Sequence, residues 1–109
     1  MIVFLNGHFL PESEAVISIN DRGFLLGDGL FETIRVVNSR PFRMAQHLER
    51  MTRGLNFLKI TPSFTPKELQ KFAVDLVERN KLPDSILLSK RIPAGSDASS
   101  NSSVSSMTN

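Results

Sequence analysis

The chain has 109 residues, which is enough for one modest domain whose core needs no cross-links. It contains no cysteine, so disulfides, thiolate catalysis and cysteine-ligated metal sites are excluded. Thirteen basic and 11 acidic residues give a formal net charge of +2, and a hydrophobic fraction of 40% is ordinary for a globular protein. The two histidines are far apart and show no metal-ligand spacing. The apolar N-terminal run breaks at Asn6-Gly7, so we expect a cytoplasmic protein without a signal peptide or membrane span.

Two short strands are expected over residues 2–10, joined by a tight turn. Asn6 and Gly7 both tolerate positive φ, which a type I′ hairpin requires. Residues 15–19 are expected to form a further short extended segment. The glycine-rich stretch over residues 23–29 then indicates a loop in which the backbone turns sharply or approaches another group closely.

Leu30–Val37 is the strongest strand prediction in the chain. One face of this strand carries Phe31, Thr33, Arg35 and Val37, and the other carries Leu30, Glu32, Ile34 and Val36. Neither face is purely polar, so we expect a central strand with one face near a cleft. A turn at Asn38-Ser39 leads into residues 40–43, which are expected to pair back as a short strand.

Two helices and one more strand are expected after this turn. Residues 44–58 are expected to form an amphipathic helix, because apolar side chains recur there at helical spacing: Met44, Leu48, Met51, Leu55 and Leu58. A second helix over residues 66–80 begins with a capping box of Thr65 and Glu68. Residues 85–92 are expected to begin a further strand.

The composition changes near residue 94. The last 16 residues contain seven serines, and their only larger apolar side chains are Val104 and Met107. Such a segment is expected to bury too little apolar surface to offset the entropy of ordering it, so we expect a disordered tail over residues 93–109. The remaining elements predict an α+β domain over residues 1–92, in which a mostly antiparallel sheet from residues 2–42 packs against two helices.

A positive stretch lies between Arg35 and Arg53, where five arginines face a single acid. Such a field favours an anionic ligand, but nucleic acid is not the expected partner because no recognised binding motif accompanies the arginines. Arg50 lies at the border of the apolar stripe of the first helix, beside His47 and Gly54. Its guanidinium can hold a phosphate there with two hydrogen bonds, or its stem can simply cover the margin of the core.

The residues from Ile19 to Arg50 read INDRGFLLGDGLFETIRVVNSRPFRMAQHLER. Glycines among acids, followed by a β-rich run, a turn and an arginine-bearing helix, resemble the N-terminal signature of the class IV pyridoxal-phosphate enzymes. These are the branched-chain and D-amino-acid aminotransferases and aminodeoxychorismate lyase. The resemblance extends over residues 2–92, is strongest from 20 to 50, and does not choose among these enzymes.

The resemblance implies roles for three residues and a cofactor, pyridoxal 5'-phosphate. Arg50 ends an H-x-x-R segment after the F-E-T strand, and this matches the family's ligand of the cofactor phosphate. Phe31 is implied on the wall of the substrate pocket, although it can also be an ordinary core phenylalanine. Arg35 shares the face of Phe31 and is expected either to meet an anionic substrate group or to pair with Glu14 or Asp21.

Four other polar side chains are not expected to take part in catalysis. Asp21 and Asp28 are expected to hold the loop geometry through hydrogen bonds to the backbone. His47 is expected to donate to a neighbouring carbonyl. Glu32 resembles a general base, but the sequence supplies no second titrating group for it to work with.

None of the five lysines lies in a context that resembles the family's catalytic lysine segment, which comes downstream in a separate domain. We therefore expect a truncated class IV protein that is inactive by itself and has no catalytic residue of its own. A frame change or premature stop near residue 88 is the expected origin of the tail.

The family reaction transfers an amino group between an amino acid and a 2-oxo acid, which are the small-molecule partners that the resemblance implies. Two alternatives stay open: a lyase domain of the aminodeoxychorismate type, which cleaves a C–C bond, and a non-catalytic module that binds a phosphorylated ligand or a partner subunit. A homodimer is a possible assembly because family members are typically dimers. Neither nucleic acid nor a membrane is an expected partner.

Overall fold

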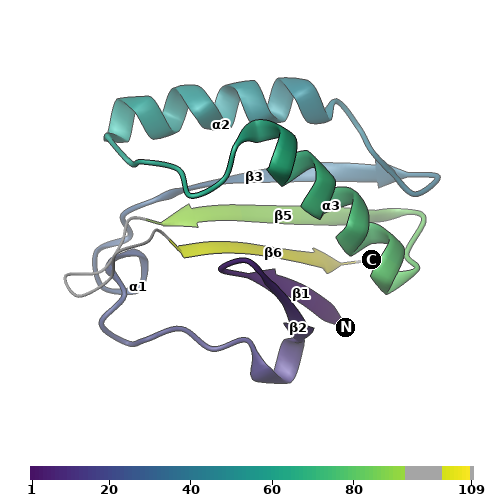
Figure 1. The fold of residues 1–109 in the computed structure, drawn as a ribbon, viewed down its shortest axis with the longest axis horizontal. Coiled ribbons are helices and arrows are strands. Elements are labelled where there is room, and N and C mark those ends of the chain that lie inside the picture. Colours follow the sequence, from purple (N-terminus) through teal and green to yellow (C-terminus); the bar gives the residue numbers. More distant parts are fainter. Residues whose placement is uncertain (93–101, 109) are drawn as a thin grey trace.

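Two long helices cover one side of a six-stranded sheet in this computed structural model, which describes residues 1–92 and 102–108 (Figure 1). The strands are β1 (Ile2–Leu5), β2 (His8–Pro11), β3 (Leu30–Val37), β4 (Arg40–Pro41), β5 (Ser85–Ile92) and β6 (Ser102–Thr108). The helical elements are the 3-10 turn η1 (Glu12–Glu14), the short α1 (Arg22–Leu26), and the long α2 (Met44–Leu58) and α3 (Pro66–Asn80). The α+β class is therefore confirmed.

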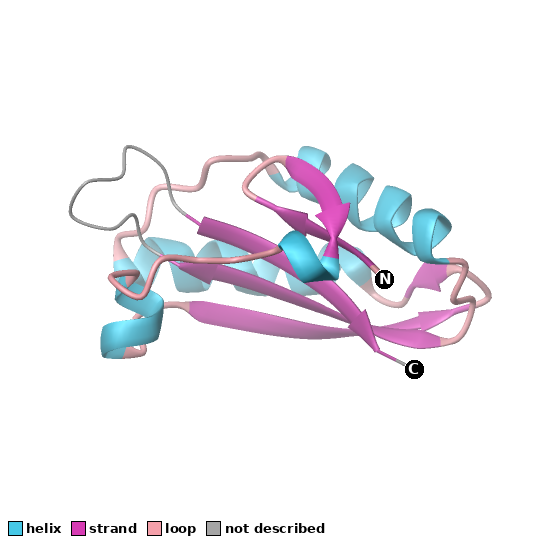
Figure 2. Ribbon diagram, turned by 90° about the horizontal axis from the view of Figure 1, so that it is seen from below, coloured by secondary structure: helices cyan, strands magenta, loops and turns pink. Residues whose placement is uncertain are grey.

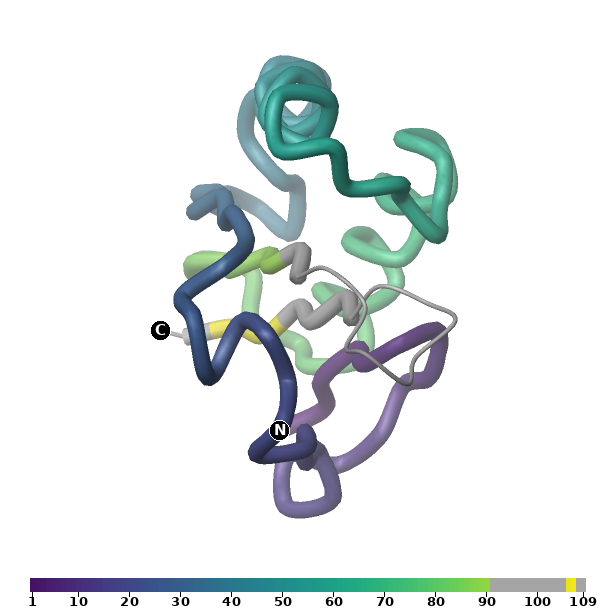
Figure 3. The backbone as a smooth tube through the Cα atoms, turned by 90° about the vertical axis from the view of Figure 1, so that its left-hand side faces the viewer, coloured from purple at the N-terminus to yellow at the C-terminus, as the bar shows by residue number. Residues whose placement is uncertain are grey.

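The sheet has the strand order β2-β1-β6-β5-β3-β4, and all its pairings are antiparallel. The expected sheet over residues 2–42 is thus incomplete, because the last two strands of the chain fill its centre and join β1 to β3. Figure 2 shows α3 and α1 on opposite sides of this sheet, and the end-on view of Figure 3 shows the same separation.

The expected disorder over residues 93–109 is wrong for Ser102–Thr108, while residues 93–101 and 109 lie outside the described part. Strand β6 pairs with β5 along its whole length and with β1 through Val104 and Ser105. Met107 is only 2% exposed and joins the core. A serine-rich composition predicted too little apolar burial, but a strand between two others is also stabilised by backbone hydrogen bonds along both of its edges.

The core lies between the sheet and the two helices. The predicted stripe of α2 is buried except at its last residue, Leu58, whose place in the core is taken by Ile60. On α3 the capping box of Thr65 and Glu68 forms as expected, and its apolar face is buried through Leu69, Ala73, Leu76 and Val77. In the part of the chain that the structure describes, no helix is long and apolar enough to cross a bilayer.

The first 30 residues fold partly as expected. Asn6 and Gly7 have φ values of 51° and 92°, which fits the predicted type I′ hairpin between β1 and β2. Residues 15–19 were expected to form a short extended segment, but they join no strand of the sheet. They lie between η1 and a turn. The expected glycine loop contains the five-residue helix α1, which Gly27 ends in a left-handed conformation.

Candidate functional site

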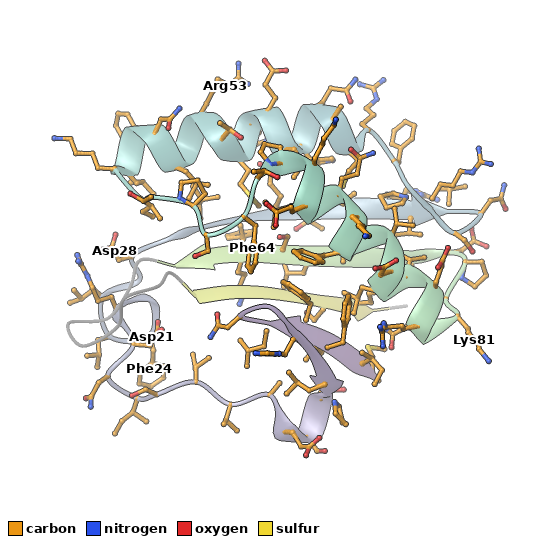
Figure 4. The ribbon with its side chains drawn as sticks, viewed as in Figure 1. Asp21, Phe24, Asp28, Arg53, Phe64 and Lys81 are labelled. Carbon is orange, nitrogen blue, oxygen red and sulfur yellow. The ribbon has the colours of Figure 1, made fainter. Side chains whose placement is uncertain are left out.

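Two acids shape the turn that leads into β3. The Asp21 carboxylate caps α1 by accepting a hydrogen bond from the backbone N–H of Gly23 at 2.8 Å. Asp28 pairs with the guanidinium of Arg22 at 2.7 Å. Figure 4 shows Asp21, Phe24 and Asp28 gathered around this short helix. The structure therefore places Asp21 as expected, whereas Asp28 meets a side chain and not the backbone.

Strand β3 separates the candidate residues onto two faces. Its side chains alternate between exposed and buried from Phe31 to Val37, as the sequence pattern predicted. Phe31 and Arg35 lie on the open face, away from the helices. Glu32 lies on the opposite face, against α2, where it is only 6% exposed.

Glu32, His47 and Arg50 form a cluster between β3 and α2. The Oε2 atom of Glu32 is 2.8 Å from Nδ1 of His47, and its Oε1 atom is 3.2 Å from Nε of Arg50. His47 and Arg50 are three residues apart and so share one face of the helix. Because an ionised carboxylate only accepts hydrogen bonds, Nδ1 of His47 donates to Glu32.

This cluster corrects two expectations from the sequence. His47 binds the Glu32 carboxylate and not a neighbouring carbonyl. Glu32 does have charged and titratable neighbours, because the fold brings His47 and Arg50 of helix α2 against it. The signal that could have found the cluster is a buried acid opposite a helix face with a histidine and an arginine, since a buried carboxylate requires partners.

Arg50 is the member of the cluster that can meet a ligand. Its side chain is 74% exposed, although its Nε edge faces Glu32. Arg53, on the same helix, points away from the sheet into solvent and pairs only loosely with Glu49 at 3.9 Å (Figure 4). The guanidinium of Arg50 therefore combines a fixed inner edge with accessible outer N–H groups, which suits a phosphate.

The open face carries the other two predicted residues. Phe31 is 64% exposed, so the alternative of a core phenylalanine is wrong. No ion pair of Arg35 with Glu14 or Asp21 is found among the described residues. Arg35 instead borders a shallow open depression that also includes Asp84 and Ile86.

One residue on the open face was not singled out from the sequence. Lys90 of β5 stands directly opposite Phe31 in the strand register, and both are exposed. Neighbouring strand positions in direct register place their side chains on the same face. No sequence motif marks Lys90, because only the pairing of β5 with β3 brings it there. The other four lysines lie on or directly after α2 and α3, and all are exposed: Lys59, Lys67, Lys71 and Lys81.

Comparison with known proteins shows the same ancestry as the sequence signature. The profile of the amino-transferase class IV family matches residues 29–108. This match extends into the serine-rich segment. A D-alanine aminotransferase of Staphylococcus aureus (strain MSSA476) is 38% identical over 85 residues, which are 78% of this chain and 30% of that protein. An aminodeoxychorismate lyase of Bacillus subtilis is 35% identical over 83 residues, which are 76% of this chain and 28% of that protein.

Solved structures share the fold over nearly the whole chain. A branched-chain amino acid aminotransferase of Escherichia coli superposes with a TM-score of 0.90 at 17% identity, covering 99% of this chain and 40% of the other. A branched-chain aminotransferase of Thermoproteus uzoniensis superposes with a TM-score of 0.87 at 24% identity, over 99% and 40% of the two chains. The chain thus spans less than a third of the full length of these curated relatives and corresponds to the N-terminal region of such proteins. Sequence and fold agree, and the chain belongs to the class IV aminotransferase family.

Proposed function

We propose that this chain holds the phosphate of pyridoxal 5'-phosphate in a class IV aminotransferase-like protein, with Arg50 as the anchor. The observation that carries the proposal is the guanidinium of Arg50, which is exposed to a ligand on one side and paired with the buried Glu32 on the other. A planar guanidinium with accessible N–H groups matches the oxygens of a phosphate. The donor set therefore fits the phosphate of this cofactor.

The open face of β3 is proposed to form part of the substrate pocket. Phe31 offers an exposed aromatic ring for the apolar part of a substrate, and Arg35 offers a cation for a carboxylate. The substrates of the proposed reaction are an amino acid and a 2-oxo acid. Bound pyridoxal phosphate supplies an electron sink at the amino-acid carbon. The contribution of these residues is to bind and orient the substrate.

The covalent attachment of the cofactor is proposed to come from a lysine outside these 109 residues. Lys59 and Lys81 occupy left-handed positions at the ends of α2 and α3, where their side chains are exposed. Lys67 and Lys71 are exposed on α3. No buried site surrounds any of these four amines, and burial is one way in which an enzyme lysine is made reactive. We therefore propose that the chain alone is not an active enzyme.

The residues of the chain are compatible with both chemistries of its relatives. The matched proteins include a D-alanine aminotransferase and an aminodeoxychorismate lyase, so amino transfer is the proposed reaction and C–C bond cleavage is the alternative. Measurements on a protein that also contains the lysine-bearing part would separate them, because only amino transfer consumes a 2-oxo acid.

Cofactor binding by the purified chain tests the proposal. Pyridoxal phosphate is titrated into wild type, Arg50→Ala and the matched control Arg53→Ala, and its visible spectrum is recorded. Loss of charge-assisted hydrogen bonds, each contributing about 1.5–3 kcal/mol, is expected to weaken binding by about 10- to 100-fold in Arg50→Ala only. Equal affinity of wild type and Arg50→Ala would overturn the role of Arg50.

Borohydride reduction followed by mass spectrometry tests the statement about lysine. Scattered or absent labelling is expected. A single stoichiometric label would contradict the proposal that the attaching lysine lies elsewhere. Lys90 is the residue to inspect first, because its register places it beside Phe31.

A further inference from the structure

The Glu32 carboxylate divides its two oxygens between two side chains of α2. Oε2 accepts a hydrogen bond from His47 at 2.8 Å, and Oε1 faces the Nε atom of Arg50 at 3.2 Å. Glu32 itself is buried and sits on β3, next to the exposed Phe31. A strand of the sheet thereby fixes the orientation of an arginine that belongs to a helix.

We propose that Glu32 is a positioning residue, which determines the edge of the Arg50 guanidinium that is offered to a phosphate. This inference rests on the proposed function of Arg50. A guanidinium has five N–H donors in a rigid fork, and it can approach an anion either side-on through Nε and one Nη or end-on through both Nη atoms. Because Glu32 occupies the Nε edge, a bound phosphate meets the two Nη atoms end-on.

His47 supports this arrangement by holding the other carboxylate oxygen. The histidine lies one helical turn before Arg50, and its half-buried ring is packed between the helix and the sheet. With Oε2 engaged, rotation of the carboxylate would break the hydrogen bond to His47. The orientation of Oε1 towards Arg50 is therefore fixed before any ligand binds.

Two opposing effects of Glu32 on anion binding must be weighed. A negative carboxylate repels a phosphate, but Glu32 is already paired with Arg50 and His47, and most of the Arg50 side chain lies in water, whose high dielectric constant weakens the repulsion. An exposed arginine that is already ordered loses less rotamer freedom when the anion binds. The ordering of Arg50 acts directly at its contact with the phosphate, so we expect it to outweigh the repulsion from Glu32. Glu32 is therefore expected to strengthen phosphate binding.

The chain offers a matched control on the same helix. Glu49 and Arg53 form an i,i+4 pair at 3.9 Å, and both side chains are 71% exposed. This pair has the same charges as Glu32 and Arg50 but no buried member and no supporting histidine. Removing the Glu49 carboxylate changes the net charge of the chain by the same amount without touching the cluster.

The test is a titration of inorganic phosphate, and separately of pyridoxal phosphate and pyridoxal, into the 109-residue chain. Binding is followed by the NMR signals of the arginine Nε–Hε groups, which Arg50→Ala and Arg53→Ala assign. The variants are Glu32→Gln and Glu49→Gln, and thermal unfolding shows that each is folded. Glu32→Gln is expected to weaken the binding of phosphate and pyridoxal phosphate by about two- to tenfold, as the immobilisation of one long side chain implies. Pyridoxal binding and the Glu49→Gln variant are expected to stay unchanged.

The signal of Arg50 gives a readout that a purely structural role would not change. In the free wild-type chain we expect its Nε–Hε proton to exchange more slowly than that of Arg53, and we expect Glu32→Gln to speed this exchange. If Glu32→Gln fails to fold, His47→Ala is used instead. It frees one carboxylate oxygen and is expected to weaken phosphate binding in the same direction.

The outcomes separate the positioning role from the anchor itself. Absence of any effect of phosphate on Arg50 in the wild type would overturn the proposed function. Phosphate that binds at Arg50 as tightly in Glu32→Gln as in the wild type, or more tightly, would overturn the positioning role and leave the anchor in place. Equal weakening by Glu32→Gln and Glu49→Gln would also overturn it, because a general charge effect would then explain both.

Discussion

The two faces of strand β3 carry side chains of similar composition but place them in different surroundings. The face against α2 carries Ile34 and Val36, which are almost completely buried, together with the acid Glu32. The open face carries an aromatic residue and an arginine, and both are exposed. Apolar burial explains the first face, because removing such side chains from water stabilises the fold. Phe31 is 64% exposed and therefore contributes much less apolar burial to folding than Ile34 or Val36.

Truncating one side chain on each face of β3 tests whether the two faces differ in their contribution to stability. Ile34 is 0% exposed, so Ile34→Ala is expected to lower the free energy of unfolding by about 2–5 kcal/mol through lost burial and a cavity. The adjacent Thr33→Ala, on the open face, is expected to change it by no more than about 0.5 kcal/mol. Urea unfolding of both variants with equal m-values measures the difference. Similar losses would mean that the open face is also covered in solution.

A second, smaller effect concerns a polar anchor on the helix side. The Asn80 side chain accepts a hydrogen bond from the backbone N–H of Ile2 at 2.7 Å and donates one to the carbonyl of the same residue at 2.8 Å. It thereby ties the end of α3 to the start of β1. Asn80→Ala leaves these part-buried backbone groups without that partner and is expected to cost about 1–3 kcal/mol.

The measurement for Asn80→Ala is again urea unfolding, combined with amide hydrogen exchange at Ile2. Faster exchange at Ile2 is expected in the variant. Gln70→Ala, at an exposed position of the same helix, is the control and is expected to stay close to the wild type. Unchanged exchange in Asn80→Ala would show that the sheet alone holds β1.

The sequence predicted the elements that depend on local patterns. The apolar stripe of α2, the capping box at Thr65 and the Asn6-Gly7 turn all have short-range physical causes, and all are confirmed except for Leu58 at the end of the stripe. Strand β6 could not be predicted in this way. Its stability comes from pairing with β1 and β5, which are distant in the sequence, and composition carries no information on such pairing.

At the candidate site, too, features with local causes were predicted and contacts between distant segments were not. Helical spacing predicted the position of Arg50 at the border of the apolar stripe of α2. Strand spacing predicted that Phe31 and Arg35 share one face of β3. The contact between Glu32 and the helix did not follow, because it depends on how α2 crosses β3. The register of Lys90 opposite Phe31 likewise required the structure.

The smallest predicted effect lies at Gly54 of α2, which packs against Leu30 of β3. A Cβ atom added at Gly54 would lie 2.8 Å from the Cδ2 atom of Leu30. Gly54→Ala improves the helix propensity by about 1 kcal/mol, but overpacking typically costs about 1–3 kcal/mol. Leu30 is only half-buried, and its terminal methyl group can rotate away, so the cost lies in the lower half of that range and exceeds the propensity gain only slightly. We expect a net destabilisation below about 1 kcal/mol.

A double-mutant cycle separates the gain in helix propensity from the cost of the contact with Leu30. In a Leu30→Ala background the clash is absent, so Gly54→Ala is expected to stabilise the chain by about 1 kcal/mol, the helix-propensity gain alone. The sign of the effect would therefore reverse between the two backgrounds, which urea unfolding can detect. An identical effect in both backgrounds would show that the helix and the strand do not touch at this point. The close approach that also brings Arg50 within reach of Glu32 would then need another cause.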